Sequence, residues 1–262
     1  MSAALAGRTV VNTRASHQAG ELDCLLRACG AIPISLPCIE IEFMVTPELD
    51  SGLSDLLAGH YDWLVLTSVN TVHAIADQLP ESGFPYQGFR VGCVGPRTAQ
   101  AVRDLLGLRV DLVPKAHHAK ALADALPVGR GDRILMPASM IARPELSERL
   151  SARGASVDQV VAYRTTSSSV KFDAPALIER AVDAVTFASP SAVSAFAEQF
   201  QCQGVDLTKL GRAAIACIGP STHECALHSG FSEPIVACPH TLAGLVDLLE
   251  QTFAVTTQGE EM

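Results

Sequence analysis

Apolar residues occur along this chain in two alternating patterns. Short continuous apolar runs are typical of buried strands, and longer segments with Leu, Val and Ala at helical spacing are typical of amphipathic helices. The pattern predicts strands at 8–14, 61–68, 90–94, 110–113, 133–137, 184–188, 215–218 and 235–237. It predicts helices at 15–29, 46–58, 71–79, 98–106, 119–126, 145–153, 191–200 and 241–251. Strands that alternate with helices predict an α/β fold with parallel sheets covered on both faces.

The pattern occurs twice. Residues 61–68 (YDWLVLTS) are echoed by residues 182–189 (VDAVTFAS), at an offset of 189 − 68 = 121 positions. Gly95 and Gly219, in similar turns, lie 219 − 95 = 124 positions apart. A nearly constant offset through successive elements indicates an internal duplication, and this period is too long for a solenoid. We therefore expect two similar domains.

Each copy contains a glycine turn between a strand and a helix. Residues 215–231 predict a strand, a break at Gly219, and a helix capped by Ser221 or Thr222. Residues 91–107 repeat this arrangement. A single turn of this kind is most simply an ordinary β–α connection. Two copies favour a functional role, because unpaired N–H groups and the helix dipole together bind anions.

Four candidate residues follow predicted strands directly. They are Ser68, Gly95, Ser189 and Gly219. Ligands of parallel α/β sheets bind beyond the carboxyl ends of the strands, so these residues are candidate ligand contacts. Two such sheet edges could face each other across a cleft.

Composition narrows the class of protein. With 262 residues, 48% hydrophobic and 18% charged, the chain has room for two globular domains with their own cores. It contains no apolar run near the roughly 20 residues of a membrane span. The first residues, MSAALAGR, do not resemble a signal peptide. We expect a cytoplasmic protein that does not interact with membranes.

Charge and metal-ligand spacing exclude further classes. A formal net charge of −9 without a basic stripe argues against nucleic-acid binding. The eight cysteines form no CxxC pair and predict no disulfide framework. His223 and His228 are five positions apart, about 140° around a helix, which does not suit a shared metal ion. We expect no metal site.

The ordered set of motifs resembles one known family. The segments YDWLVLTSVNTV, VGCVGPRTAQAV, VAYRT, VTFASPSAVSAF, IACIGPSTHECAL and TLAGLVDLL resemble those of uroporphyrinogen-III synthases over about residues 8–250. The resemblance implies two similar parallel-sheet α/β domains, one discontinuous, joined by a two-stranded β ribbon. The implied ranges are 1–36 with 167–262 for one domain, 43–160 for the other, and 34–42 with 159–166 for the ribbon.

The resemblance also implies a reaction. Linear hydroxymethylbilane would be cyclised to uroporphyrinogen III, with inversion of the last pyrrole ring and loss of water, in tetrapyrrole (haem) biosynthesis. This is the activity of a cyclising hydro-lyase without cofactor or metal. The substrate carries many carboxylates, which suits helix N-termini at a sheet edge. We expect a monomer that contacts the preceding pathway enzyme transiently.

Site residues follow by position within the matching motifs. Tyr163 in VAYRT matches the tyrosine that assists departure of the hydroxyl, although an aromatic residue also suits an edge strand. The expected substrate contacts are Ser68, Gly95, Thr98, Ser189, Gly219, Thr222, Arg14 and Arg143. The threonines could instead be plain helix caps, and the arginines could be solvated surface residues. Arg97 departs from the family pattern, and its role stays open.

The alternative interpretation is a non-catalytic binding protein. Two α/β lobes that close on a small polyanionic ligand would also explain the duplication and the glycine turns. This interpretation gives no reason for Tyr163. Production of the type III isomer from hydroxymethylbilane distinguishes the two.

Overall fold

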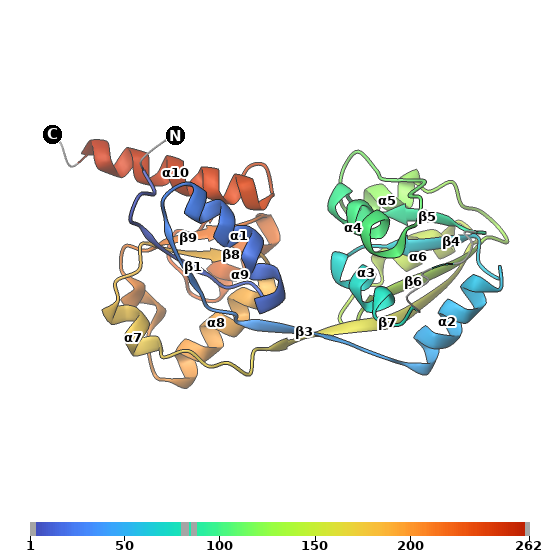
Figure 1. Ribbon diagram of the computed structural model, residues 1–262, viewed down its shortest axis with the longest axis horizontal. Coiled ribbons are helices and arrows are strands. Elements are labelled where there is room, and N and C mark those ends of the chain that lie inside the picture. Colours follow the sequence, from blue (N-terminus) through green and yellow to red (C-terminus); the bar gives the residue numbers. More distant parts are fainter. Residues whose placement is uncertain (1–3, 80–83, 85–87, 260–262) are drawn as a thin grey trace. The chain divides into compact units, whose positions relative to one another are not determined.

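The computed structural model describes residues 4–79, 84 and 88–259. The chain divides into two compact units (Figure 1). Unit 1 comprises Met1–Glu40 and Thr166–Met262, and unit 2 comprises Ile41–Thr165. Unit 1 is therefore assembled from two separate segments, between which the whole of unit 2 is inserted.

Unit 1 is built on a five-stranded sheet with the order β10-β9-β8-β1-β2, and the neighbouring strands run parallel. The strands are β1 (Thr9–Asn12), β2 (Ile32–Ser35), β8 (Ala184–Phe187), β9 (Ala214–Cys217) and β10 (Ile235–Val236). The helices are α1 (Ser16–Ala28), α7 (Ala174–Glu179), α8 (Pro190–Cys202), α9 (Pro220–His228) and α10 (Leu242–Gly259), with a 3₁₀ turn at Leu207–Leu210. The α/β fold expected from the alternating pattern is confirmed.

Unit 2 contains the second five-stranded sheet, with the order β3-β7-β6-β4-β5. Its strands are β3 (Ile39–Phe43), β4 (Trp63–Leu66), β5 (Arg90–Cys93), β6 (Arg133–Ser139) and β7 (Ser156–Ser167). Its helices are α2 (Pro47–Leu57), α3 (Val69–Ala76), α4 (Pro96–Leu106), α5 (Ala119–Ala125) and α6 (Glu145–Ala152). The β7–β6, β6–β4 and β4–β5 pairs are all parallel.

The two sheets share one strand order. The series β2-β1-β8-β9-β10 in unit 1 corresponds to β7-β6-β4-β5 in unit 2, followed by a single bridge between Gly92 and Leu112. The strand expected at 110–113 is therefore wrong: only this bridge forms. Pro114, which has no N–H to donate, follows directly and limits further pairing.

Each sheet has a point at which the direction of chain connection reverses. In unit 1, β1 leads outward to β2, whereas β8 leads to β9 and β10 on the other side. In unit 2, β4 leads to β5 and β6 leads to β7 in opposite directions. The reversal points lie between β1 and β8, and between β4 and β6. In parallel α/β sheets, ligands bind at the carboxyl ends of the strands on either side of such a point.

The link between the units is formed by β3 and β7. The N–H of Met44 donates to the carbonyl of Ala162 at 2.9 Å, and the N–H of Ser168 donates to that of Cys38 at 2.9 Å. The expected start of this ribbon at residue 34 is wrong, because Ile34 belongs to β2 and pairs with Val11. Pro33 can be accommodated in β2 because an edge strand pairs with a neighbour on one side only. The first half of β7 also pairs with β6, inside the sheet of unit 2.

The sheet of unit 2 is buried on both faces. Leu64 and Leu66 pack into one core cluster, whereas Trp63 and Val65 pack into another. Successive side chains of a strand point to opposite faces, which explains why β4 is apolar throughout.

Within the described residues, no helix is both long enough and apolar enough to cross a membrane.

Candidate active site

A cavity in unit 2 brings three of the expected site residues together. Ser68, Arg143 and Tyr163 all line a space of about 270 Å³, together with Thr67, Ala119, Met136, Ala138, Ser139, Ala142 and Leu146. Ser68 follows β4, Arg143 lies in the loop after β6, and Tyr163 is on β7. The cavity therefore lies at the reversal point of the sheet of unit 2, where its topology favours ligand binding.

Tyr163 is positioned by an irregularity in the sheet. The β6–β7 register shifts between Ala138 and Ser139, so that Ser139 pairs with Tyr163. The N–H of Met140 donates to the carbonyl of Tyr163 at 2.9 Å, which fixes the loop after β6 against β7. Only 8% of Tyr163 is exposed. Among the residues that the structure describes, none forms a hydrogen bond with its hydroxyl, so this O–H is available to a bound molecule.

The two expected arginines have different surroundings. Arg143 is exposed, and no carboxylate in the described part of the chain forms an ion pair with it. Arg14, at the carboxyl end of β1 in unit 1, is held against its own helix. Its Nε donates to the carbonyl of Gln18 at 2.9 Å. Arg143 is therefore the better placed of the two for a substrate carboxylate.

Ser68 and Ser189 begin the equivalent helices α3 and α8. The Oγ of Ser68 accepts a hydrogen bond from the N–H of Asn70 at 3.1 Å. The Oγ of Ser189 accepts one from the N–H of Ala192 at 3.2 Å. Both helices are therefore capped by their own serines. The hydroxyl of Ser68 can still donate its proton to a ligand, whereas that of Ser189 also lies 3.1 Å from Oγ of Ser191.

The helices after the glycine turns begin differently. Gly95 and Gly219 are themselves the N-cap residues of α4 and α9, and neither helix has a side-chain cap. The expected cap at Ser221 or Thr222 is therefore wrong, because proline starts the helix immediately after the glycine. The first turns of α4 and α9 are left without the side-chain acceptor that α3 and α8 have.

Thr98 and Thr222 occupy the third helical position of α4 and α9. They are buried, with 5% and 2% exposed. Within the described residues, neither their N–H groups nor their hydroxyls have a hydrogen-bond partner. The alternative that these threonines are plain N-caps is thereby contradicted.

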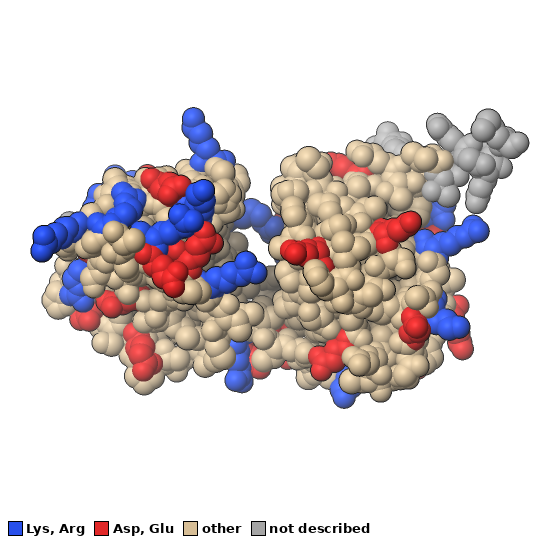
Figure 2. All heavy atoms as spheres, turned by 180° about the vertical axis from the view of Figure 1, so that it is seen from behind, with Lys and Arg blue, Asp and Glu red and all other residues tan. Residues whose placement is uncertain are grey.

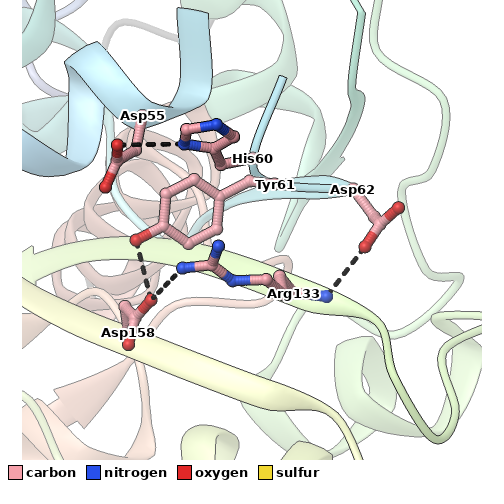
Figure 3. Close-up of polar contacts among 6 residues, drawn as sticks. All are labelled: Asp55, His60, Tyr61, Asp62, Arg133 and Asp158. Carbon is pink, nitrogen blue, oxygen red and sulfur yellow. Dashed lines mark hydrogen bonds and ion pairs between the residues drawn. The ribbon is translucent and has the colours of Figure 1, made fainter. Parts of the chain in front are cut away.

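A polar network that the sequence did not predict lies at the amino-terminal ends of the unit 2 strands, at the other end of the strands from the cavity (Figure 3). The hydroxyl of Tyr61 donates to Oδ2 of Asp158 at 2.7 Å, and Arg133 lies over the Tyr61 ring. Burial, and then the hydrogen bond to Asp158, raise the pKa of Tyr61 to about 12. The hydroxyl of Tyr61 is therefore used in a hydrogen bond within the protein. That of Tyr163 has no such partner among the described residues.

The repeated aspartates of the duplicated motif also lie at this amino-terminal edge. Asp62 accepts a hydrogen bond from the N–H of Arg133 at 2.8 Å (Figure 3). Asp183 accepts one from the N–H of Thr9 at 2.7 Å. Each carboxylate binds the first N–H of the neighbouring strand. Their repetition in the sequence is explained by sheet assembly.

Charged side chains of both signs are mixed on the surface. Figure 2 shows Lys and Arg beside Asp and Glu on one face of unit 2. Ion pairs of unit 2 include Arg109–Asp111 at 2.8 Å and Arg164–Glu42 at 2.6 Å. No group of three or more His, Cys, Asp or Glu side chains in the described ranges could hold a metal ion.

Comparison with known proteins gives a consistent result. The family described as uroporphyrinogen-III synthase HemD matches residues 20–247. A protein of Synechococcus elongatus named uroporphyrinogen-III synthase is 30% identical, and the alignment covers 97% of this chain and 98% of that protein. The matched residues belong to both units, so the family relationship is not limited to one of them.

Solved structures agree in fold. The uroporphyrinogen III synthase of Thermus thermophilus, in a mutant form, aligns with a TM-score of 0.61 and 20% identity, over 95% of this chain and all of that one. The enzyme of Helicobacter pylori aligns with a TM-score of 0.63 and 14% identity, over 94% and 99% of the two chains. At these identities the likeness concerns the fold alone.

Proposed function

Since the chain belongs to the uroporphyrinogen-III synthase family, we propose that it is a cyclising hydro-lyase that converts hydroxymethylbilane into uroporphyrinogen III. The observation that carries the proposal is the unpaired hydroxyl of Tyr163 in a cavity that also contains Ser68 and Arg143. A proton donor, a second hydroxyl and an arginine fork are the groups that an anionic substrate with a leaving hydroxyl requires.

The proposed reaction begins with loss of the terminal hydroxyl of the substrate. The pyrrole nitrogen assists cleavage of the C–O bond, and Tyr163 donates the proton with which the hydroxyl leaves as water. The electrophilic carbon then forms a C–C bond to the α-carbon of the last ring that already carries the neighbouring methylene bridge. The older bridge bond breaks, and the freed methylene carbon forms a C–C bond to the other α-carbon of the ring, which inverts the ring. The proton displaced from that ring returns to the tyrosinate. Atoms balance as one substrate giving one macrocycle and one water.

Most of the catalytic task in this proposal is positioning. An unassisted chain can close without inversion, so the protein has to hold the last ring in the geometry that leads to the type III isomer. The carboxylates of the substrate provide the points of attachment. Arg143 can bind one of them in unit 2, and the uncapped starts of α4 and α9 can bind others through backbone N–H groups.

The direct test supplies purified protein with hydroxymethylbilane and separates the type I and type III isomers of the product. We expect the type III isomer to dominate, without added metal or cofactor. Type I alone, at the rate of a control without protein, would show that the chain lacks this activity. Tight binding of the substrate without turnover would favour the non-catalytic alternative.

Assembly and pathway contacts are further parts of the proposal. We expect the chain to act as a monomer, since each unit has its own hydrophobic core and needs no second chain to complete it. The substrate is reactive in its linear form, which favours a transient contact with the enzyme that produces it. Sedimentation, with and without that enzyme, measures both properties.

A further inference from the structure

A histidine lies against each of the two glycine turns. A Cβ atom placed on Gly95 would be 3.4 Å from Cβ of His117. One placed on Gly219 would be 3.7 Å from Cγ of His240. Each pair lies within a single unit, and both histidines are exposed. An imidazole therefore borders the N-terminal end of α4, and another borders that of α9.

The two histidines are equivalent in the duplication. They lie 240 − 117 = 123 positions apart, one fewer than the 124 positions between the two glycines. Each directly precedes the residue that caps the following helix. His118 accepts from the N–H of Ala121 at the start of α5, and Thr241 accepts from the N–H of Gly244 at the start of α10. The same tertiary position has thus been filled by histidine in both copies.

Neither crowding nor backbone conformation requires a glycine at position 95 or 219. Their φ angles of −159° and −165° are extended and accessible to any residue. The distances above correspond to ordinary van der Waals contact, so a small side chain would fit. A serine there could cap the helix, as Ser68 and Ser189 do for α3 and α8. Glycine instead leaves the helix N–H groups to another acceptor.

A buried and unpaired side chain gives independent support for a ligand at each helix start. Thr98 and Thr222 are more than nine-tenths buried, and no described residue bonds to their hydroxyls. A helical Cα–Cβ bond tilts toward the helix N-terminus, so both threonines are directed at the same end that the glycines leave open. Neither hydroxyl oxygen is among the fully buried side-chain atoms that lack a partner within the described residues, so a ligand can reach each of them and accept its proton.

We infer that His117 and His240 are further substrate-binding residues, each contacting a carboxylate held at the start of α4 or α9. The inference rests on the proposed function and adds an imidazole side chain to each of two sites otherwise built from backbone N–H and threonine O–H donors. In His240, Nδ1 lies 2.7 Å from the carbonyl of Ala237 and must carry the proton of that hydrogen bond. The Nε2 atom is the end that remains for the ligand.

This geometry permits a substitution that separates binding from structure. His240→Asn keeps an N–H near the position of Nδ1 and so preserves the bond to Ala237, but removes Nε2. His228→Asn is the matched control in the same unit, because Nδ1 of His228 lies 2.7 Å from the carbonyl of Glu224 on α9. In unit 2, His117→Ala is compared with His60→Ala, since His60 pairs with Asp55 at the opposite edge (Figure 3).

The experiment measures binding of uroporphyrinogen III, kinetics with hydroxymethylbilane, and unfolding for each variant. We expect His117→Ala and His240→Asn each to raise the Kd and KM about two- to fivefold, as for the loss of one partly exposed hydrogen bond. The kcat and the unfolding midpoint should stay near those of wild type, and both control variants should bind like wild type. In wild-type protein, ring signals of His117 and His240 should shift in NMR spectra on addition of uroporphyrinogen III, while those of His60 stay fixed.

Two results would overturn the inference. One is wild-type affinity in both His117→Ala and His240→Asn. The other is ring signals that do not respond to the ligand. If wild-type protein still makes the type III isomer in either case, only the role of the histidines fails. If wild-type protein makes no type III isomer, the proposed function itself fails.

Discussion

The carboxylate of Asp183 accepts a hydrogen bond of 2.7 Å from the backbone N–H of Thr9, across 174 positions of sequence. The same carboxylate binds the guanidinium of Arg8 at 2.8 Å. These contacts join the two segments of unit 1 at the start of β1. Asp62 makes the corresponding bond to Arg133 in unit 2. A single repeated aspartate thus ties neighbouring strands in both sheets.

Asp183→Ala should therefore destabilise unit 1. Loss of a partly buried hydrogen bond to a charged group predicts a decrease of about 1.5–3 kcal/mol in the free energy of unfolding. Urea unfolding of wild type and variant measures this change. Asp247→Ala, on the exposed side of α10, is the control and should change stability by less than about 0.5 kcal/mol. Equal stabilities for the two variants would contradict the structural role of Asp183.

Tyr163→Phe should slow formation of the type III isomer by about 10²-fold or more, because general acid assistance to the leaving hydroxyl is lost. Product affinity should change little. Tyr61→Phe removes the same atom at the opposite edge of the same sheet and should leave turnover near that of wild type. Initial rates from isomer separation provide the measurement. A Tyr163→Phe variant with wild-type turnover would remove this residue from the mechanism.

Thr98→Ala and Thr222→Ala should each weaken substrate binding. Each removes one hydroxyl contact to a charged acceptor, worth about 1.5–3 kcal/mol, but leaves the helix N–H groups in place. The double variant should bind more weakly than either single variant. Because neither threonine caps its helix, stability should fall less than binding does. Wild-type affinity in the double variant would show that the helix starts are not part of the site.

Gly95→Ser and Gly219→Ser should each weaken substrate binding without lowering stability. A serine at the N-cap supplies the side-chain acceptor that α4 and α9 lack, and should preserve the free energy of unfolding or raise it by a few tenths of a kcal/mol. The same oxygen occupies the N–H groups on which a substrate carboxylate depends. We expect a higher KM with unchanged or higher thermal stability, measured on the same preparations. A variant that is more stable and has an unchanged KM would argue against an anion site there.

Alkaline pH should destabilise the protein partly through Tyr61. Its pKa is raised from 10.0 to about 12, chiefly by burial, so the folded state retains a proton that the unfolded state has lost. The contribution is complete below pH 10 and disappears as the pH rises toward 12. Wild type should lose more stability than Tyr61→Phe between about pH 9.5 and pH 12 in urea titrations. Parallel losses in the two proteins would show that this phenol does not contribute.

The sequence alone determined the features that depend on local patterns. Apolar runs and helical spacing predict most of the strands and helices, although not β2, β3, β7 or α7. The nearly constant offset between the copies predicts two similar α/β units. Thr46 as the cap of α2, with Pro47 at the first helical position, is also confirmed, because capping is decided within a few residues. Glycine turns at Gly95 and Gly219 were recognisable for the same reason.

Only the tertiary structure decided how these elements combine. Ser68, Arg143 and Tyr163 share a cavity because β4 lies beside β6 and β6 beside β7, an order that no local pattern encodes. The exact helix starts, the unpaired hydroxyls of Thr98 and Thr222 and the histidines beside the glycines depend on contacts between residues far apart in the chain. Burial and hydrogen-bond satisfaction are properties of the packed state, so a residue's type suggests a role but its neighbours in space assign it.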